Sequence, residues 1–173
     1  MKETTLCYLE KDNKYLMLHR TRKKNDFNEG KWIGVGGKFE EGETADQCVC
    51  REVLEETGIR MNSLRKRAVI DFVSDTFPDE IMHLYTCDDF EKVCEPVDDE
   101  GDLQWIDKER ILDLPLWEGD VIFLKMLLED RDFFRLRLQY HEYDLIDWEL
   151  KYYSRIIKCV ENKRCPFQAP VSF

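Results

Sequence analysis

The chain has 173 residues, of which 43% are hydrophobic and 12% aromatic, and its formal net charge is -11 at neutral pH. This length and composition fit one folded domain with its own core and exclude a disordered, collagen-like or coiled-coil protein. The negative charge argues against stable nucleic-acid binding through the phosphate backbone, because that mode of binding needs many lysine and arginine side chains.

The first part of the chain predicts a β-hairpin followed by a loop. Residues 4–9 and 15–20 resemble strands, and the turn between them falls at Asp12-Asn13, residue types that favour tight turns. A polar, basic loop follows at residues 21–31, and after it a short apolar run ends at Gly36-Gly37. Loops of this kind often carry binding residues.

A helix is predicted over residues 44–57, because apolar side chains recur at three- and four-residue spacing from Ala45 to Val53. Thr44 is suited to cap the start of this helix, and Gly58 is suited to end it.

The second half of the chain predicts a mixture of strands and one further helix. The expected strands lie at residues 67–73, 81–86, 102–106, 133–140 and 144–153, and the expected helix, largely buried, lies at residues 118–129. Beyond residue 153 the pattern is ambiguous, and we expect a short helix and a loose tail. Together these elements predict an α/β (α+β) fold in which a mixed sheet is flanked by two helices. We expect one domain over residues 1–153 and a C-terminal extension of unknown role over residues 154–173.

Cysteines and apolar segments bear on the cellular compartment. The seven cysteines form no Cys-x-x-Cys pair and have no histidine at zinc-ligand spacing, so we expect free thiols, with a zinc site as the alternative. The first residues lack the apolar run of a signal peptide, and no long apolar span follows. We therefore expect a cytoplasmic protein that does not contact membranes. The oligomeric state stays open.

Glu52, Glu55 and Glu56 share one face of the predicted helix, since a helix advances about 100° per residue. Their mutual repulsion costs the helix a few tenths of a kcal/mol. A hard divalent cation such as Mg²⁺ would reverse this repulsion, because carboxylate oxygens are its preferred ligands. The alternative is a solvated acidic face. A glycine pair before the helix, which permits close backbone approach, and an arginine beside the glutamates favour the metal site.

The spacing of these residues resembles a known motif. Gly37 is followed at the sixth position by Glu43 and, eight positions later, by the run Arg51-Glu52-Val53-Leu54-Glu55-Glu56-Thr57-Gly58-Ile59. This matches the Nudix box at every defined position, so the chain is identified as a member of the Nudix hydrolases, with the box at residues 37–59. The resemblance implies a Nudix fold, a mixed sheet sandwiched between helices. It also implies hydrolysis of a nucleoside diphosphate linked to another group, with Mg²⁺, for which Mn²⁺ can substitute.

The same resemblance assigns expected roles within the box. The metal ligands would be Glu52, Glu55 and Glu56, a main-chain carbonyl of Gly36 or Gly37, and a later carboxylate, for which Glu100 is the best candidate and Asp98 and Asp99 compete. The catalytic base would be Glu52 or Glu56, since clustered carboxylates share protons. Arg51 would orient a glutamate and Glu43 would support the loop. Lys38 either contacts phosphate or is an ordinary surface lysine.

Outside the box, roughly residues 4–150 are similar to the MutT-like branch, which includes 8-oxo-dGTP diphosphatases. The similarity lies in "EGKWIGVGGKFEEGET", "HLYTCDDFE", "DDEGDLQWI" and "LPLWEGD". It implies a nucleotide substrate whose base would lie among Phe27, Phe72 and Trp117, with Asp120 at the base edge and Lys23 near the entrance. The chain departs from the animal enzyme at Ile33 and Gly119, so its recognition of the base must differ in detail.

The main expectation is therefore a metal-dependent hydrolase of oxidised purine nucleoside triphosphates such as 8-oxo-dGTP, which releases the monophosphate and pyrophosphate and cleans the nucleotide pool. A second possibility is a Nudix hydrolase of another diphosphate, such as ADP-ribose or a dinucleoside polyphosphate. A third is a nucleotide-binding sensor without catalysis, against which the intact glutamates argue.

Overall fold

The computed structural model describes residues 1–22, 27–97 and 100–153 and the backbone of residues 158–161. In chain order the elements are β1 (Lys2–Lys11), β2 (Lys14–His19), β3 (Trp32–Ile33), α1 (Ala45–Thr57), β4 (Ile59–Met61), β5 (Arg65–Ser74), β6 (Glu80–Cys87), β7 (Phe90–Lys92), β8 (Asp102–Asp107), the 3₁₀ helix η1 (Lys108–Asp113), α2 (Glu118–Leu128), β9 (Phe134–His141), β10 (Asp144–Tyr153) and β11 (Lys158–Glu161).

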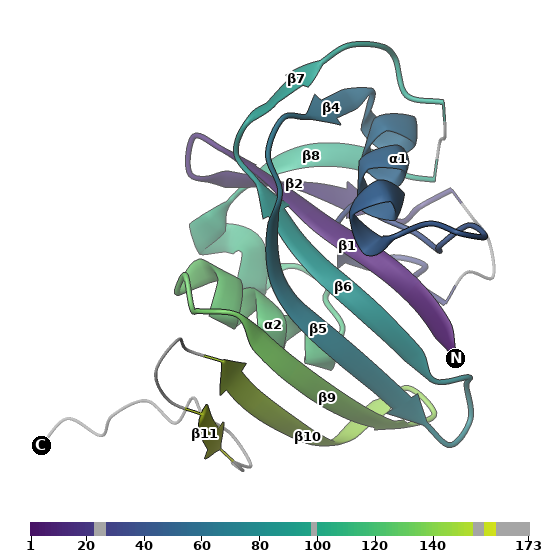
Figure 1. Ribbon diagram of the computed structural model, residues 1–173, viewed down its shortest axis with the longest axis vertical. Coiled ribbons are helices and arrows are strands. Elements are labelled where there is room, and N and C mark those ends of the chain that lie inside the picture. The colour runs from purple at the N-terminus through teal and green to yellow at the C-terminus, as the bar shows by residue number, and fades with distance from the viewer. Residues whose placement is uncertain (23–26, 98–99, 154–157, 162–173) are drawn as a thin grey trace, which may run out of the picture.

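One mixed sheet organises the molecule (Figure 1). Its strands follow the order β11-β10-β9-β5-β6-β1-β2-β3, and β8 also pairs with β2, outside this order. The pairs β1–β6 and β5–β9 are parallel, and the others are antiparallel. The short strands β4 and β7 pair separately beside α1.

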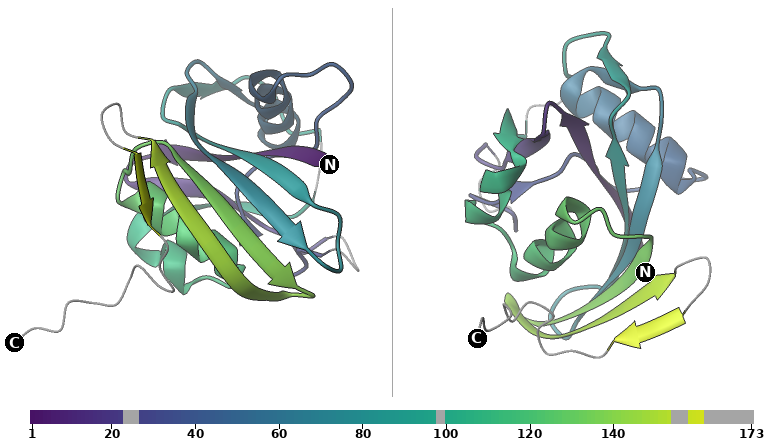
Figure 2. Two further views of the ribbon diagram at one scale, coloured as in Figure 1. Left: turned by 60° about the horizontal axis from the view of Figure 1, so that its bottom comes forward. Right: turned by 90° about the vertical axis from the view of Figure 1, so that its left-hand side faces the viewer.

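The two α-helices cover opposite faces of this sheet, which confirms the predicted sandwich. Side chains alternate along β1: Leu6 and Tyr8 pack into the cluster that contains α2, whereas Cys7 and Leu9 pack into the cluster that contains α1. The right-hand view of Figure 2 shows α1 and α2 on either side of the strands. The sheet therefore has a core on each face.

Local chemistry sets the ends of α1 as the sequence predicted. Thr44 and Gln47 form a reciprocal capping box, in which each side chain accepts a hydrogen bond from the other's backbone N–H. Gly58 ends the helix with a φ of 70°, and its N–H donates to the carbonyl of Leu54. Because a Cβ at Gly58 would lie 1.9 Å from the carbonyl oxygen of Cys94, no larger residue fits. Because both ends of α1 are fixed, the position of its acidic face relative to the loop that contains Gly36 and Gly37 is fixed as well.

The structure differs from the predictions in its short elements. Strands β4 and β7 have three residues each, too few for a periodic pattern, and η1 was also not predicted. The expected short helix beyond residue 153 is wrong where the structure describes the chain, because β11 pairs with β10 as a strand. No helix among the described residues is long and apolar enough to cross a membrane.

Candidate active site

Arg51 organises the acidic end of the site. Its Nε and Nη2 atoms donate to the two carboxylate oxygens of Glu43 at 2.7 and 2.9 Å. Its Nη1 atom donates to Glu52 at 2.8 Å and to Glu55 at 3.1 Å. Nη2 also reaches the main-chain carbonyl of Lys38 at 3.0 Å. One guanidinium therefore links three carboxylates on α1 and the loop before it.

This contact shifts the ionisation of Glu43. Hydrogen bonds from Arg51 lower the pKa of the Glu43 carboxyl to about 2, and the same hydrogen bonds raise the pKa of Arg51. Both groups are therefore charged at neutral pH. The Lys38 side chain, in contrast, is exposed.

Gly37 brings the backbone against the glutamates. A Cβ built at Gly37 would lie 2.4 Å from Cδ of Glu52, so only glycine leaves room for that carboxylate. A Cβ at Gly36 would lie 2.1 Å from the carbonyl oxygen of Thr5, and the N–H of Thr5 donates to the Gly37 carbonyl at 2.8 Å. The two glycines thus let β1, the loop and Glu52 meet at one point.

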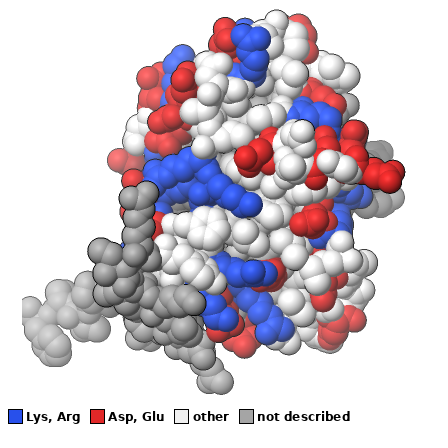
Figure 3. Space-filling view, viewed as in Figure 1, with Lys and Arg blue, Asp and Glu red and all other residues white. Residues whose placement is uncertain are grey.

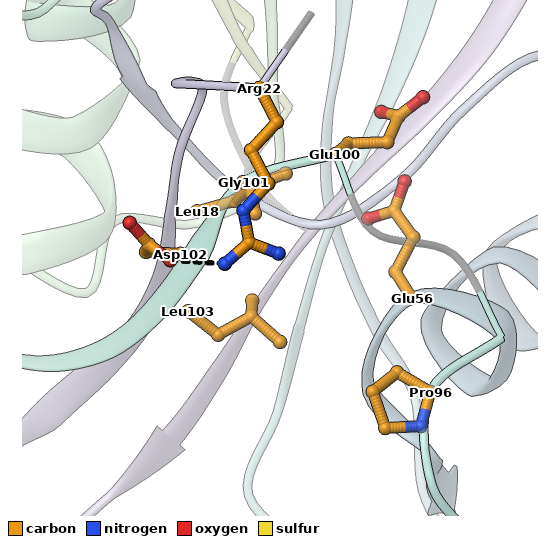
Figure 4. Close-up of a pocket in the computed structure, with 8 residues that line it drawn as sticks. All are labelled: Leu18, Arg22, Glu56, Pro96, Glu100, Gly101, Asp102 and Leu103. Carbon is orange, nitrogen blue, oxygen red and sulfur yellow. Dashed lines mark hydrogen bonds and ion pairs between the residues drawn. The ribbon is translucent and has the colours of Figure 1, made fainter.

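Glu56 points into a pocket of about 240 Å³ (Figure 4). The side chain is only 7% exposed and extends from α1 toward the segment that carries Glu100. Glu100 lines the same pocket and forms an ion pair with Arg20, while Arg22 donates to Asp102 at 2.7 Å. The full lining consists of Leu18, Arg22, Glu56, Pro96, Glu100, Gly101, Asp102 and Leu103.

The sequence suggested Glu100 but not the two arginines. The sequence feature that could have indicated them is the basic run "HRTR", which begins at the last residue of β2. The competing candidates Asp98 and Asp99 lie outside the described residues.

The oxygen atoms that these residues offer are of the kind that a hard divalent cation prefers. Carboxylates on α1 and a carboxylate at Glu100 would supply oxygen ligands, and the glycine loop places main-chain atoms against Glu52. No group of three or more His, Cys, Asp or Glu side chains in the described ranges already lies at metal-binding spacing. This is compatible with Mg²⁺, which is commonly held by one or two protein carboxylates together with substrate phosphates and waters.

A second cluster, of aromatic rings, forms at the start of α2. Phe27 stacks on Trp117 with ring centroids 4.6 Å apart. Phe77 and Tyr143, which the sequence analysis did not single out, join the same cluster through Phe27. Lys31 lies with its Nζ 4.8 Å from the centroid of the Trp117 ring. The predicted entrance residue Lys23 lies outside the described residues.

Asp120 lies on the first turn of α2, three residues after Trp117, and is 6% exposed. Burial raises the pKa of its carboxyl to about 7, and the nearby charge of Lys31 opposes this shift in part. Within the described ranges, no side chain donates a hydrogen bond to the Asp120 carboxylate. The side chain is therefore poised to change its charge near neutral pH.

Phe72 belongs to the inner side of this region. It is half-buried on β5, and its ring stacks on Tyr140 at 6.4 Å. Among the described contacts no ring interaction joins Phe72 to Phe27 or Trp117. The hydroxyl of Tyr140 accepts a hydrogen bond from the N–H of Gly119 at 3.0 Å, and a Cβ at Gly119 would lie 2.5 Å from that hydroxyl. At this glycine, where the chain departs from the animal enzyme, any larger residue would make the Tyr140 ring shift.

Charged side chains of both signs lie on the surface near the candidate site. In the face seen in Figure 3 the basic side chains form a patch left of the centre, and acidic groups are prominent around α1 and the loop before it. Cations would have to mediate the approach of a polyphosphate to this acidic region.

Comparisons with known proteins bear on the family of this chain. The NUDIX domain profile matches residues 2–127. The oxidized purine nucleoside triphosphate hydrolase of Danio rerio is 36% identical over 116 residues, which cover 64% of this chain and 71% of that protein. The Nudix hydrolase YvcI of Bacillus subtilis is 30% identical over 155 residues, 87% of this chain and 94% of the relative. The solved MutT protein of Bacillus halodurans aligns with a TM-score of 0.76 at 25% identity, covering 87% of this chain and 97% of that one.

The motif on α1, the two-faced mixed sheet and these matches converge. The chain belongs to the Nudix hydrolase family, whose members are pyrophosphohydrolases that act on phosphoanhydride bonds.

Proposed function

We propose that this protein hydrolyses purine nucleoside triphosphates, including oxidised ones such as 8-oxo-dGTP, to the monophosphate and pyrophosphate, with Mg²⁺ or in its place Mn²⁺. Its role would be to remove damaged nucleotides from the nucleotide pool. The observation that carries the substrate class is the buried Asp120, with a pKa of about 7, three residues after the ring of Trp117.

A purine fits this pair of groups. The faces of a purine stack on an aromatic ring, and its edge carries N–H donors and ring acceptors. A carboxyl with a pKa near 7 populates both states at neutral pH, so it accepts from an N–H when ionised and donates to a ring nitrogen or carbonyl when protonated. The oxidised base 8-oxoguanine differs from guanine in the pattern of donors and acceptors on its edge. Asp120 is therefore the residue we assign to base discrimination.

The other end of the site handles the phosphates. A bound divalent cation would supply positive charge to the phosphoryl oxygens and lower the pKa of the attacking water. Glu52, held by Arg51, and Glu100 are the residues we assign to metal binding together with Glu55 and Glu56. Glu56 is our choice for the residue that accepts the proton of the attacking water, because it is buried and faces the pocket. Arg22 lines the same pocket, and we assign it to contact with a phosphate.

The Danio rerio relative is an oxidized purine nucleoside triphosphate hydrolase, which supports the same substrate class for this chain.

The experiment incubates the purified protein with Mg²⁺, Mn²⁺ or a chelator and a panel of dGTP, 8-oxo-dGTP, dATP, dCTP, ADP-ribose and a dinucleoside tetraphosphate. Chromatography identifies the products. We expect pyrophosphate and the monophosphate from purine triphosphates, faster than from dCTP, and no turnover with the chelator. Release of AMP from ADP-ribose without pyrophosphate from any triphosphate would overturn the proposal. Tight nucleotide binding without turnover would instead favour a sensor.

A further inference from the structure

Both Phe27 and Tyr143 cover the ring of Trp117. Phe27 stacks on it at 4.6 Å with an interplanar angle of 19°, and Tyr143 lies at 6.2 Å with an angle of 15°. The ammonium of Lys31 lies over the same ring at 4.8 Å. The stacking surface that we assign to the substrate base is therefore already in contact with the protein's own side chains.

Two further contacts hold Phe27 in this position. The edge of Phe77 meets its ring at 5.2 Å and 78°, and Tyr143 lies 5.5 Å from it. Phe77 and Tyr143 also contact each other at 5.5 Å. Phe27 is 48% exposed and Tyr143 is 57% exposed, so these rings form the outer surface of the cluster.

An ion pair and a hydrogen bond join the two turns that carry Phe77 and Tyr143. The ion pair of His141 and Asp75, at 2.6 Å, joins the turn between β9 and β10 to the loop between β5 and β6. The N–H of Glu142 donates to the hydroxyl of Thr76 at 3.3 Å. Within the loop, the hydroxyl of Ser74 accepts from the N–H of Phe77 at 3.1 Å. Phe77 and Tyr143 therefore present a fixed pair of rings to Phe27.

The spacing leaves no room for a base on this side of Trp117. For a base to lie between two aromatic rings, those two rings must be about 7 Å apart, because each stacked layer takes about 3.5 Å. The centroids of Phe27 and Trp117 are 4.6 Å apart. A base can therefore stack there only after Phe27 withdraws and loses its contacts with Phe77 and Tyr143.

We propose that the substrate base stacks on the face of Trp117 that Phe27 covers, and that Phe77 and Tyr143 set the affinity of the base site by holding Phe27 there, so that the base competes with a side chain of the protein. This inference rests on the proposed function, in which Trp117 stacks the base. Both residues are positioning residues, since they act through Phe27. If the site is open in only a fraction of the molecules, the apparent Kd of the ligand equals its Kd for the open site divided by that fraction.

The direction of the effect follows from this competition. Removal of the Tyr143 ring takes away its contact with Phe27, which exists only while Phe27 lies on Trp117. Such contacts favour the closed arrangement by a factor of about 2 to 10 for one aromatic pair. The Tyr143→Ala and Phe77→Ala variants should therefore bind nucleotide about 2- to 10-fold more tightly, with a lower KM and an unchanged kcat.

The experiment measures the Kd of dGMP and 8-oxo-dGMP by calorimetry without metal, and then KM and kcat for the triphosphate. Tyr143→Phe keeps the ring and should behave like the wild type. Tyr153→Ala is the matched control, because Tyr153 is 42% exposed and contacts the ring of Phe133, outside the cluster. Trp117→Ala tests the base site itself.

The outcomes separate the two proposals. If Trp117→Ala leaves the Kd of the monophosphates unchanged, the assignment of the base site fails. If Trp117→Ala weakens binding but Tyr143→Ala and Phe77→Ala do not tighten it, only the present inference fails. Weaker binding in Tyr143→Ala and Phe77→Ala would indicate that these two rings contact the base directly. Tighter binding in both variants, absent in Tyr143→Phe and Tyr153→Ala, would support it.

Discussion

Both carboxylate oxygens of Glu43 accept hydrogen bonds from the guanidinium of Arg51, at 2.7 and 2.9 Å. This two-point contact joins the loop before α1 to the helix and orients the guanidinium, whose remaining nitrogen reaches Glu52 and Glu55. The planar fork of arginine makes such a contact possible, and the single ammonium of lysine does not. Because the acidic face of α1 is the expected metal site, the position of its carboxylates depends on this one cation.

Replacement of Arg51 by lysine should therefore disturb both charge and position. In Arg51→Lys the pKa of Glu43 should rise from about 2 toward its usual value, because the two-point hydrogen bond is lost. Carboxyl NMR titration of the wild type and the variant measures this shift. Turnover should fall together with it. An unshifted Glu43 resonance in the variant would contradict the assigned role of Arg51.

Gly37→Ala should impair catalysis more than stability. The new Cβ would lie 2.4 Å from Cδ of Glu52, so the carboxylate must move, and a flexible side chain can do so at little cost in folding. A displacement of about 1 Å at a reacting site can cost about 100-fold in rate. We expect a loss of this order in kcat and a weaker response to Mg²⁺, with a Tm close to that of the wild type.

The control for Gly37→Ala is Glu41→Ala in the same exposed loop. Full activity of Gly37→Ala, with the same Mg²⁺ dependence, would show that Glu52 does not have to lie where the structure places it.

Glu56→Gln should retain the fold and lose metal-dependent turnover. The amide has nearly the same shape, and a neutral group at a position that is only 7% exposed does not require solvation of a charge. Loss of a positioned base costs about 100- to 10,000-fold in rate. Rate and Tm are measured on the same preparation, with the exposed Glu41→Gln as the control. Turnover at the wild-type level would remove Glu56 from the mechanism.

Asp120 should make stability depend on pH. The folded-state pKa is about 7 and the ordinary value is 3.8, so between these values the folded protein keeps a proton that the unfolded chain has released. Stability therefore falls as pH rises from about 4 to about 7, by at most about 4 kcal/mol, and this contribution is constant above pH 7.

Asp120→Asn removes this dependence, because an amide carries no charge at any pH. The Tm of the variant should exceed that of the wild type by several degrees at pH 8, and the difference should shrink at pH 5. Asp132→Asn, at an exposed position, serves as the control. A difference in Tm that is the same at both pH values would argue against the titration of Asp120 in this range.

The longer elements could be predicted from the sequence, because their local patterns are strong. The helix α1 begins and ends at its predicted caps, and β5, β6, β8, α2, β9 and β10 lie within a few residues of their predicted ranges. The strands β4, β7 and β11 could not be predicted, because they have three or four residues and are stabilised by a partner strand rather than by a pattern of their own. The same distinction applies to the site.

The chemistry of the acidic end was determined by the sequence alone. Glu52, Glu55 and Glu56 share a face of any α-helix, and the glycines and Arg51 lie at fixed short distances along the chain from them. The tertiary structure decided the aromatic end. Phe27, Phe77, Trp117 and Tyr143 come from four separate segments and meet only because the sheet brings their loops together. The raised pKa of Asp120 is likewise a consequence of burial, a property of the packed molecule that no local sequence pattern contains.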